Sequence, residues 1–264
     1  MKTLRQKAIS AAAVALLTGL ASASAFAADT PENPEDASAT SPISANVTVV
    51  NDYRYRGLSQ SNFKPAIQGG FDYAHESGFY IGNWNSSISW ISDAYGQNGS
   101  VGGNNSAGKT VSAPIEMDFY AGFKKELIGE GFASDIGFLQ YYYPTSGLPN
   151  NATNPNTSEV YIAQNFTFGP VTGFAKFSYA LTQIFGTANS AGSFYPDLTL
   201  NYDTGVWGLS LNGHIGYQYI AGNLNNGSSS YAGVPIANGT SNNSLYSYTD
   251  WKLGVTKDLS LIHI

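Results

Sequence analysis

The segment PIEMDFYAGFKKE, residues 114–126, alternates apolar and polar side chains from Ile115 to Lys124. One set of alternate positions carries Ile115, Met117, Phe119, Ala121 and Phe123, and the other carries Glu116, Asp118, Tyr120 and Lys124. Successive side chains of a β-strand point to opposite faces, so this period predicts a strand with one apolar and one polar face. Its 13 residues exceed the about 5–6 usual in soluble sheets and suit a membrane-crossing strand, which needs about 9–11.

The same alternation recurs along the chain and predicts ten antiparallel strands. They are expected at residues 44–58, 64–75, 79–91, 114–126, 132–143, 158–168, 171–183, 194–203, 206–220 and 246–257. Tight turns (HESG, IGEG, GP and DTG) alternate with long loops rich in Gly, Asn and Ser at 92–113, 144–157 and 221–245. Short and long connections are therefore expected at opposite ends, as in an up-and-down transmembrane β-barrel.

Composition favours this interpretation over a soluble β-sandwich. Charged residues make up only 11% of the chain, which has 18 Tyr, 14 Phe and 4 Trp, whereas soluble domains carry about 25% charge. A sandwich would also bury its apolar faces against each other. The chain has no cysteine, which excludes disulfides, thiol catalysis and thiolate metal sites. No motif indicates a cofactor.

The N-terminal region predicts export. Lys2, Arg5 and Lys7 precede an apolar run at 8–20 and a small-residue segment, so residues 1–27 are interpreted as a signal peptide. The mature chain would keep 12 − 3 = 9 Lys plus Arg against 18 Asp plus Glu, and this acidic balance argues against nucleic-acid binding. Residues 28–43, rich in Pro and acidic residues, are expected to form a disordered tail. The predicted location is the bacterial outer membrane.

The stretch NDYRYRGLSQ, residues 51–60, alternates tyrosine with arginine. If the strand at 44–58 continues through it, Tyr53 and Tyr55 reach the lipid interface, where tyrosine is favoured, and Arg54 and Arg56 face the lumen. The opposite facing would place both guanidinium groups against lipid, at up to about 2–4 kcal/mol each. Two roles remain open for the arginines: ion pairs with Asp52 or Asp72 that brace the wall, or a charged constriction that filters solutes.

The predicted facing defines two sets of candidate residues. The lumen would hold nine acidic side chains against five basic ones, an excess that predicts a modest preference for cations. The pore-lining candidates are Arg54, Arg56, Asp72, Glu116, Asp118, Lys124, Glu159, Lys176, Asp197 and Lys252. The candidates for aromatic girdles at the lipid interfaces are Tyr53, Tyr55, Trp84, Trp207, Tyr217, Tyr219 and Trp251.

Residues 51–88 resemble the TorF-type porins, a bacterial outer-membrane family described as conserved proteins of unknown function. The resemblance is carried by the pattern aromatic-x-x-Arg-Gly-x-Ser-Gln-Ser at Tyr53–Ser61 and by SGFYIGNW at Ser77–Trp84. The later strands, including DWKLGVTKDL, resemble the family in their arrangement along the chain but less closely in their residues. The resemblance implies a single barrel of about twelve strands and a channel activity, and it supplies no catalytic residues.

The C-terminal segment differs from the aromatic ending that is usual for such barrels. Residues 259–264, LSLIHI, match one reading frame of the transposon-end adapter used in sequencing libraries, so this segment is expected to be non-native. The barrel region is then 44–258, with about two closing strands missing. An incomplete barrel would leave strand edges unpaired in lipid, at several kcal/mol for each unsatisfied backbone group.

Two motifs that suggest other chemistry are weak. GNNSAGKT, residues 103–110, fits the P-loop pattern, but Pro114 and an alternating strand follow it where a P-loop requires a helix. His214 with Asp197 or Asp203 could form part of a hydrolase site, although no nucleophile is recognisable. We therefore predict a porin-like channel, surrounded by outer-membrane lipid, for passive diffusion of small hydrophilic solutes. A non-conducting structural or adhesive barrel is the alternative, and an outer-membrane hydrolase the third possibility.

Overall fold

The computed structural model describes residues 42–95, 110–150, 152–224, 229–231 and 234–258. Three of the predicted features fall outside these residues. They are the signal peptide together with most of the expected tail (1–41), the P-loop-like segment up to Lys109, and the segment 259–264.

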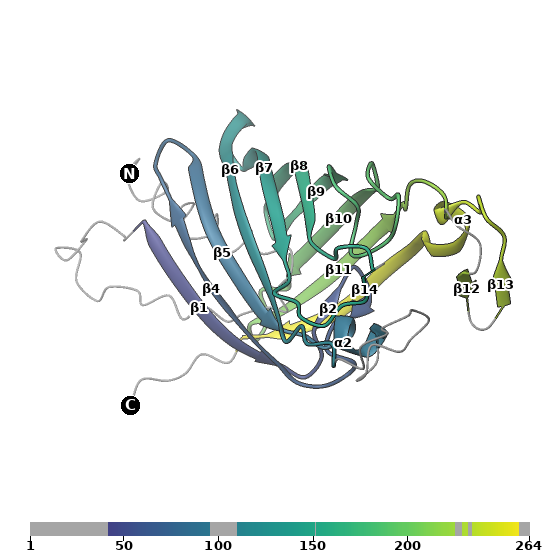
Figure 1. Ribbon diagram of the computed structural model, residues 1–264. Helices are drawn as coiled ribbons and strands as arrows, with labels where there is room; N and C mark the ends of the chain where they lie inside the picture. The colour runs from purple at the N-terminus through teal and green to yellow at the C-terminus, as the bar shows by residue number, and fades with distance from the viewer. Residues whose placement is uncertain (1–41, 96–109, 151, 225–228, 232–233, 259–264) are drawn as a thin grey trace, which may run out of the picture.

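Ten strands form one antiparallel sheet in which each strand pairs with its neighbours in the sequence (Figure 1). They are β1 (Ile43–Val50), β4 (Ala66–Ala74), β5 (Phe79–Ser87), β6 (Ile115–Gly129), β7 (Phe132–Tyr142), β8 (Thr157–Phe168), β9 (Val171–Ala180), β10 (Phe194–Asp203), β11 (Leu209–Gln218) and β14 (Tyr248–Lys257). Nine follow the predicted ranges closely, while β1 ends eight residues before the predicted limit of 58. The prediction of an all-β, up-and-down antiparallel sheet is confirmed.

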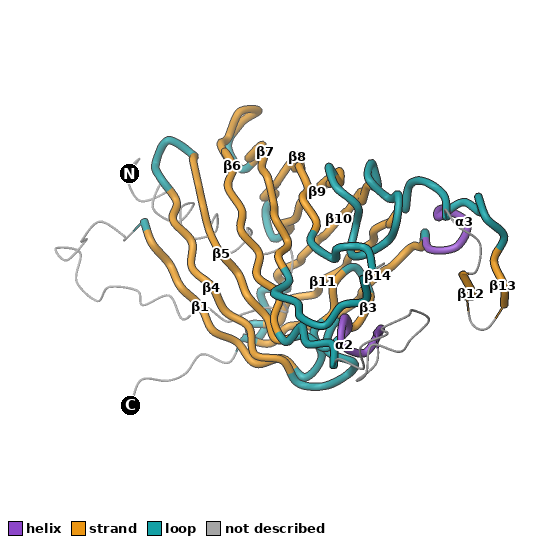
Figure 2. The backbone as a smooth tube through the Cα atoms, viewed as in Figure 1, coloured by secondary structure: helices purple, strands orange, loops and turns teal. Residues whose placement is uncertain are grey.

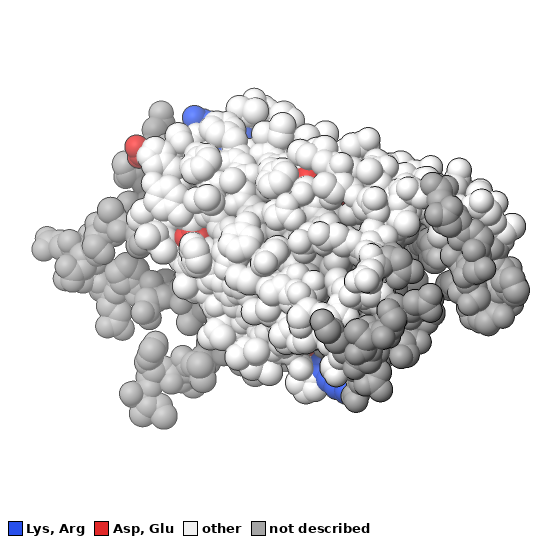
Figure 3. Space-filling view, viewed as in Figure 1, with Lys and Arg blue, Asp and Glu red and all other residues white. Residues whose placement is uncertain are grey.

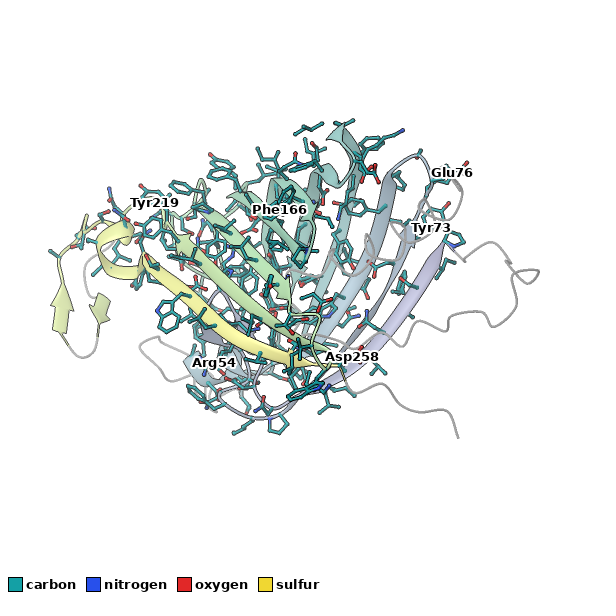
Figure 4. The ribbon with its side chains drawn as sticks, turned by 180° about the vertical axis from the view of Figure 1, so that it is seen from behind. Arg54, Tyr73, Glu76, Phe166, Tyr219 and Asp258 are labelled. Atoms are coloured by element: carbon teal, nitrogen blue, oxygen red, sulfur yellow. The ribbon has the colours of Figure 1, made fainter. Side chains whose placement is uncertain are left out.

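The connections alternate in length, as the sequence predicts. Tight turns join β4 to β5, β6 to β7, β8 to β9 and β10 to β11, and long connections lie at the opposite end of the strands. The long connections contain α2 (Trp90–Tyr95), α3 (Asn242–Tyr246) and the small β12–β13 pair (Ser229–Tyr231 and Val234–Ile236). In Figure 4, Glu76 marks a tight turn, while Arg54 and Tyr219 lie toward the other end. Within the described residues, no helix is both long and apolar enough to cross a membrane.

The two faces of the sheet have opposite polarity, and the apolar face is the exposed one. Ile136, Ile162 and Leu253 are 59%, 59% and 79% exposed, and many other apolar side chains share their face. The view in Figure 3 accordingly carries only scattered charged side chains. On the other face, Glu116 and Glu159 are each 2% exposed. This distribution is the reverse of the one in water-soluble proteins, where charged side chains are almost never fully buried.

The sheet curls around its polar face (Figure 2). One contact shows how far the curl reaches: the Tyr248 hydroxyl of β14 donates a hydrogen bond of 2.9 Å to the carbonyl of Arg56, which lies in the connection after β1. β1 and β14 are the two outermost strands of the sheet, and the described residues show no ladder between them.

Inward tyrosines lie flat over glycines of neighbouring strands. A Cβ built on Gly216 of β11 would overlap the ring and hydroxyl of Tyr195 on β10, and one built on Gly82 would meet the ring of Tyr120. The absent side chain lets each ring lie against the backbone, as in other sheets where an aromatic ring covers a glycine. The Tyr195 hydroxyl can then donate to Asp250, at 2.8 Å.

We predict that Gly216→Ala destabilises the sheet by about 1–3 kcal/mol, because the added methyl group displaces Tyr195 and overpacks the site. Gly213→Ala on the same strand is the matched control, since a Cβ there finds no atom closer than 3.7 Å. The free energy of unfolding, measured by urea titration with circular dichroism of the sheet, tests this difference. Equal effects of the two substitutions would contradict the packing argument.

Candidate functional site

The residues after β1 form a short hairpin, so the prediction of one continuous strand over 44–58 is wrong. β2 (Arg54–Tyr55) pairs with β3 (Leu58–Ser59), and the two residues between them, Arg56 and Gly57, have φ of 44° and 79°. Positive φ at both central residues is the signature of a type I′ hairpin turn. We call residues 51–61 the inner hairpin.

Polar side chains close the base of the inner hairpin. The Ser59 hydroxyl donates to the Asp52 carboxylate at 2.5 Å, and the backbone N–H of Tyr53 donates to the Ser61 hydroxyl at 3.0 Å. The backbone N–H of Gln60 also bonds the Tyr53 carbonyl at 2.7 Å. Asp and Ser side chains bonded locally in this way favour turns over continued strand. The chain therefore bends at Asn51 and Asp52 instead of extending the strand.

Tyr53, Tyr55 and Trp84 point inward, so their assignment to a lipid-facing girdle is wrong. The Tyr53 side chain is 2% exposed, its hydroxyl donates to Glu116 at 2.5 Å, and its ring packs edge-on against Trp84 with centroids 5.4 Å apart. The Tyr55 and Tyr141 hydroxyls share a hydrogen bond of 2.5 Å. The hairpin turn sends these rings over the concave face, where their hydroxyls find polar partners.

Arg56 connects the inner hairpin to strands on the far part of the sheet. Its side chain is 6% exposed, and its Nη2 lies 2.7 Å from the Glu159 carboxylate of β8. Its Nη1 donates to the Gln218 side chain of β11 at 2.7 Å, and its guanidinium lies 4.4 Å from the ring centroid of Tyr195 on β10. Arg56 is therefore inside, as predicted, although its carboxylate partner is Glu159 and not Asp52 or Asp72.

Arg54 points away from the interior, contrary to its prediction as a pore-lining residue. Its side chain is 54% exposed and forms an ion pair with Asp52 at 2.7 Å. The bracing pair proposed with Asp52 is present, but it lies at the surface at the end that bears the long connections (Figure 4). Alternate residues of a hairpin face opposite sides, so Arg54 points outward while its neighbours Tyr53 and Tyr55 point inward.

A pair of tyrosine hydroxyls holds the Glu116 carboxylate beneath the inner hairpin. Tyr53 donates to Oε1 at 2.5 Å, and Tyr143 donates to Oε2 at 2.7 Å. Burial, followed by the negative charges of Glu116 and Asp118, raises the pKa of the Tyr53 hydroxyl well above its usual value. The hydroxyl therefore stays protonated and remains a donor at neutral pH. The hairpin is thus anchored at two carboxylates, Glu116 through Tyr53 and Glu159 through Arg56.

A family model of bacterial proteins of unknown function, Gcw_chp, matches residues 35–261. The chain belongs to the Gcw_chp family. The matched region includes all ten strands and the inner hairpin. No curated protein matches the chain. Membership of the Gcw_chp family therefore assigns no activity, and the function has to be argued from the geometry.

The remaining pore-lining candidates of this Gcw_chp chain lie in the inward phase of their strands. Asp72 accepts a hydrogen bond from the Tyr120 hydroxyl at 2.5 Å, and the Lys176 ammonium lies 4.1 Å from the ring centroid of Tyr161. Lys124 and Asp197 are half-buried, while Lys252, on the outermost strand β14, is exposed. The concave face therefore collects most of the predicted charges. Those with specific partners there are Arg56, Asp72, Glu116, Glu159, Lys176 and Asp197.

The remaining girdle candidates are on the outside of the sheet. Trp207, Trp251 and Tyr217 are 81%, 72% and 37% exposed. Tyr219 stacks on Phe194 with ring centroids 4.6 Å apart. Their contact with a lipid interface stays a prediction.

His214 lies in a cluster of polar side chains of which the sequence predicted only one member, Asp197. The two ring nitrogens lie 3.0 Å from Asp197 and 3.0 Å from Asp250, and the Tyr195 hydroxyl lies 3.0 Å from Nε2. Asp197 was a predicted partner, whereas Asp203 is not one. Asp250 belongs to the edge strand β14, and only the register of three neighbouring strands brings it to the histidine. Its inward phase in β14 was the one available signal.

We predict that Arg56→Ala in this Gcw_chp protein lowers the free energy of unfolding by about 3–5 kcal/mol, because the buried Glu159 carboxylate would lose its ion-pair partner. The matched control is Arg54→Ala, which breaks an exposed pair and should cost less than about 1 kcal/mol. Denaturant titrations of the two variants measure the difference. Adding Glu159→Gln to Arg56→Ala should recover part of the lost stability. Equally small losses in the Arg56→Ala and Arg54→Ala variants would show that the Arg56 pair is not an anchor.

Proposed function

We propose that the chain is an outer-membrane β-barrel that acts as a porin-like channel for passive diffusion of small hydrophilic solutes. The observation that carries the proposal is the polarity of the sheet, with apolar side chains exposed on the convex face and charged ones enclosed on the concave face. Proteins in water rarely expose contiguous apolar patches larger than a few hundred Å². A transmembrane β-barrel needs this arrangement, because its outside meets hydrocarbon and its lumen meets water.

Strand length and loop layout support the same proposal. Nine of the ten strands have 9 to 15 residues, which matches the about 9–11 residues that a tilted strand needs to cross a bilayer. Tight turns at one end and long connections at the other are the arrangement of outer-membrane barrels. The predicted signal peptide would direct export.

Closure of the barrel is part of the proposal. Unpaired edges of β1 and β14 would be costly in hydrocarbon, at several kcal/mol for each unsatisfied backbone group. The resemblance to TorF-type porins implies about twelve strands, so about two further strands would join β1 and β14. A barrel of about twelve strands is intermediate in size. Side chains fill the lumen of an eight-stranded barrel, whereas a sixteen-stranded barrel leaves a broad channel. The passage we propose is accordingly narrow.

The inner hairpin and the enclosed charges would set what passes. The hairpin crosses the concave face at the end with the long connections, where Arg56 and Glu159 meet. Carboxylates outnumber the basic groups in this region, since Glu116, Asp118 and Glu159 are buried neighbours, while the basic groups are Arg56, which pairs with Glu159, and Lys176, which interacts with Glu159. We therefore propose a weak preference for cations.

A specific observation also favours the alternative, a non-conducting structural barrel. At the level of the inner hairpin the Arg56 and Glu159 side chains are 6% and 2% exposed, so side chains fill the interior there. If the hairpin keeps this position, the lumen is blocked and the protein acts through its outer loops or its stability. The channel proposal requires that solutes pass beside the hairpin or that the hairpin moves.

A hydrolase is not proposed, because the geometry of His214 does not suit it. A catalytic base needs one ring nitrogen free to take a proton from a nucleophile. Both nitrogens of His214 lie 3.0 Å from a carboxylate, one from Asp197 and the other from Asp250. This arrangement favours a protonated ring that holds β10 and β14 to β11.

We predict that Ile162→Arg, at the centre of β8 and on the exposed face, lowers stability in lipid by about 2–4 kcal/mol, the cost of a cation at the bilayer midplane. Phe168→Arg, on the same face at the end of β8, is the matched control and should cost about 0–1 kcal/mol because it lies near the interface. Unfolding titrations in lipid vesicles measure both values. If this face were exposed to water, both substitutions would change the stability by less than about 0.5 kcal/mol. That result would contradict the membrane assignment.

We predict that the closed barrel, with the further strands proposed above, shows small single-channel currents with a weak cation preference in planar bilayers. The double variant Arg56→Ala/Glu159→Ala removes both members of one of the two anchors of the inner hairpin, and should raise the conductance. Asp52→Ala/Arg54→Ala removes the surface pair and should leave the conductance unchanged. Absence of channels in the unmodified protein and in both variants would favour the structural barrel, and strong anion selectivity would contradict the proposed charge effect.

A further inference from the structure

Asp118 is a buried carboxylate for which the described residues supply no hydrogen-bond partner. It lies in the inward phase of β6 with 1% exposure, and neither Oδ1 nor Oδ2 is hydrogen-bonded. The other buried carboxylates beneath the inner hairpin differ in this respect. Glu116 accepts bonds from two tyrosines, and Glu159 pairs with Arg56.

The surroundings of Asp118 are aromatic and closed by the inner hairpin. Trp84 of β5 and Tyr141 of β7 lie directly opposite Asp118 in the two neighbouring ladders. Tyr53 packs on Trp84, and Tyr55 packs on Tyr141, with ring centroids 5.4 and 5.6 Å apart. The two hairpin tyrosines thus rest on the two residues that flank the carboxylate.

A carboxylate in such a position has to be neutralised. An ionised carboxyl group buried without a partner is among the most costly groups in a protein interior. A proton would remove the charge of Asp118 but would give its second oxygen no contact, since no described residue donates a hydrogen bond to either oxygen. A cation would contact the carboxylate oxygens directly, and the neighbouring aromatic faces attract positive charge.

The ligand set indicates the class of cation. Glu116 lies two residues from Asp118 on the same face of β6, at a spacing of about 6–7 Å along a strand, and Glu159 is the other acidic neighbour. The described residues contain no group of three or more acidic, His or Cys side chains placed to hold a metal ion. Ca²⁺ takes six to eight oxygen ligands, more than this site offers. A singly charged ion balances one unpaired carboxylate.

We propose that Asp118, together with Glu116, binds an alkali-metal cation on the concave face beneath the inner hairpin. As a step in solute passage this inference rests on the proposed channel function and names the class of ion for which the channel would have a site. The binding site itself depends only on the folded sheet and hairpin.

The test measures ²³Na⁺ line width with the folded protein in detergent. The unmodified protein should broaden the sodium signal, K⁺ should reverse the broadening, and the bulky cation N-methylglucamine at equal ionic strength should not. Asp118→Asn, which is close in shape, should abolish the broadening. Asp72→Asn is the matched control, because Asp72 is also a buried inward carboxylate but has a partner in Tyr120, and it should keep the broadening.

Each result decides the proposal. The proposal is overturned by any of three outcomes: the unmodified protein does not broaden the sodium signal, N-methylglucamine reverses the broadening as effectively as K⁺, or the Asp118→Asn variant keeps the full broadening. If that variant does not fold, the K⁺ and N-methylglucamine comparison on the unmodified protein still decides. The measurement needs no membrane and no current, so channels without sodium broadening would overturn only the cation site, and sodium broadening without channels would overturn only the channel.

Discussion

Enclosure of the polar face is the constraint on which the rest of the structure depends. Strands with a period of two give the sheet one apolar and one charged face, and the curl encloses the charged one. A charge without a partner is costly in such an interior. The concave side consequently contains pairs such as Arg56 with Glu159, which joins the inner hairpin to β8, and His214 with Asp250, which joins β11 to β14.

Tyrosine is the side chain that makes this enclosure workable. Its ring covers glycine backbone or packs against another ring, while its hydroxyl reaches a carboxylate one or more strands away, as Tyr120 does with Asp72 and Tyr195 with Asp250. An apolar body with a polar tip combines packing and hydrogen bonding in one residue. The inward tyrosines thus have two roles: their rings pack against the sheet, and their hydroxyls satisfy carboxylates that would otherwise be buried alone.

The sequence predicts the strands well because their order depends on local alternation, but it predicts the site less well. The facing of Trp84 could have been found from the phase of its strand, since Phe79 and Ile81 are exposed at odd positions and place even positions inward. A general preference of tryptophan for interfaces misled the assignment. Tyr53 and Tyr55 could not be assigned by phase, because the chain bends at Asn51 and Asp52, and the inward positions change from even in β1 to odd in the inner hairpin. The partners Glu159, Gln218 and Asp250 come from distant strands, and only the curl of the sheet brings them together.

The choice of residue at position 56 shows why the inner hairpin matters. A type I′ turn favours Asn, Asp or Gly at its first central position, and a non-glycine residue with positive φ costs of order 1–3 kcal/mol. Arginine at φ 44° is therefore a poor choice for the turn itself. The same side chain makes a charged pair, a hydrogen bond and a contact over Tyr195 across three strands. The turn is strained so that this guanidinium can reach Glu159, and the hairpin is held by its contacts with the sheet more than by its own turn preference.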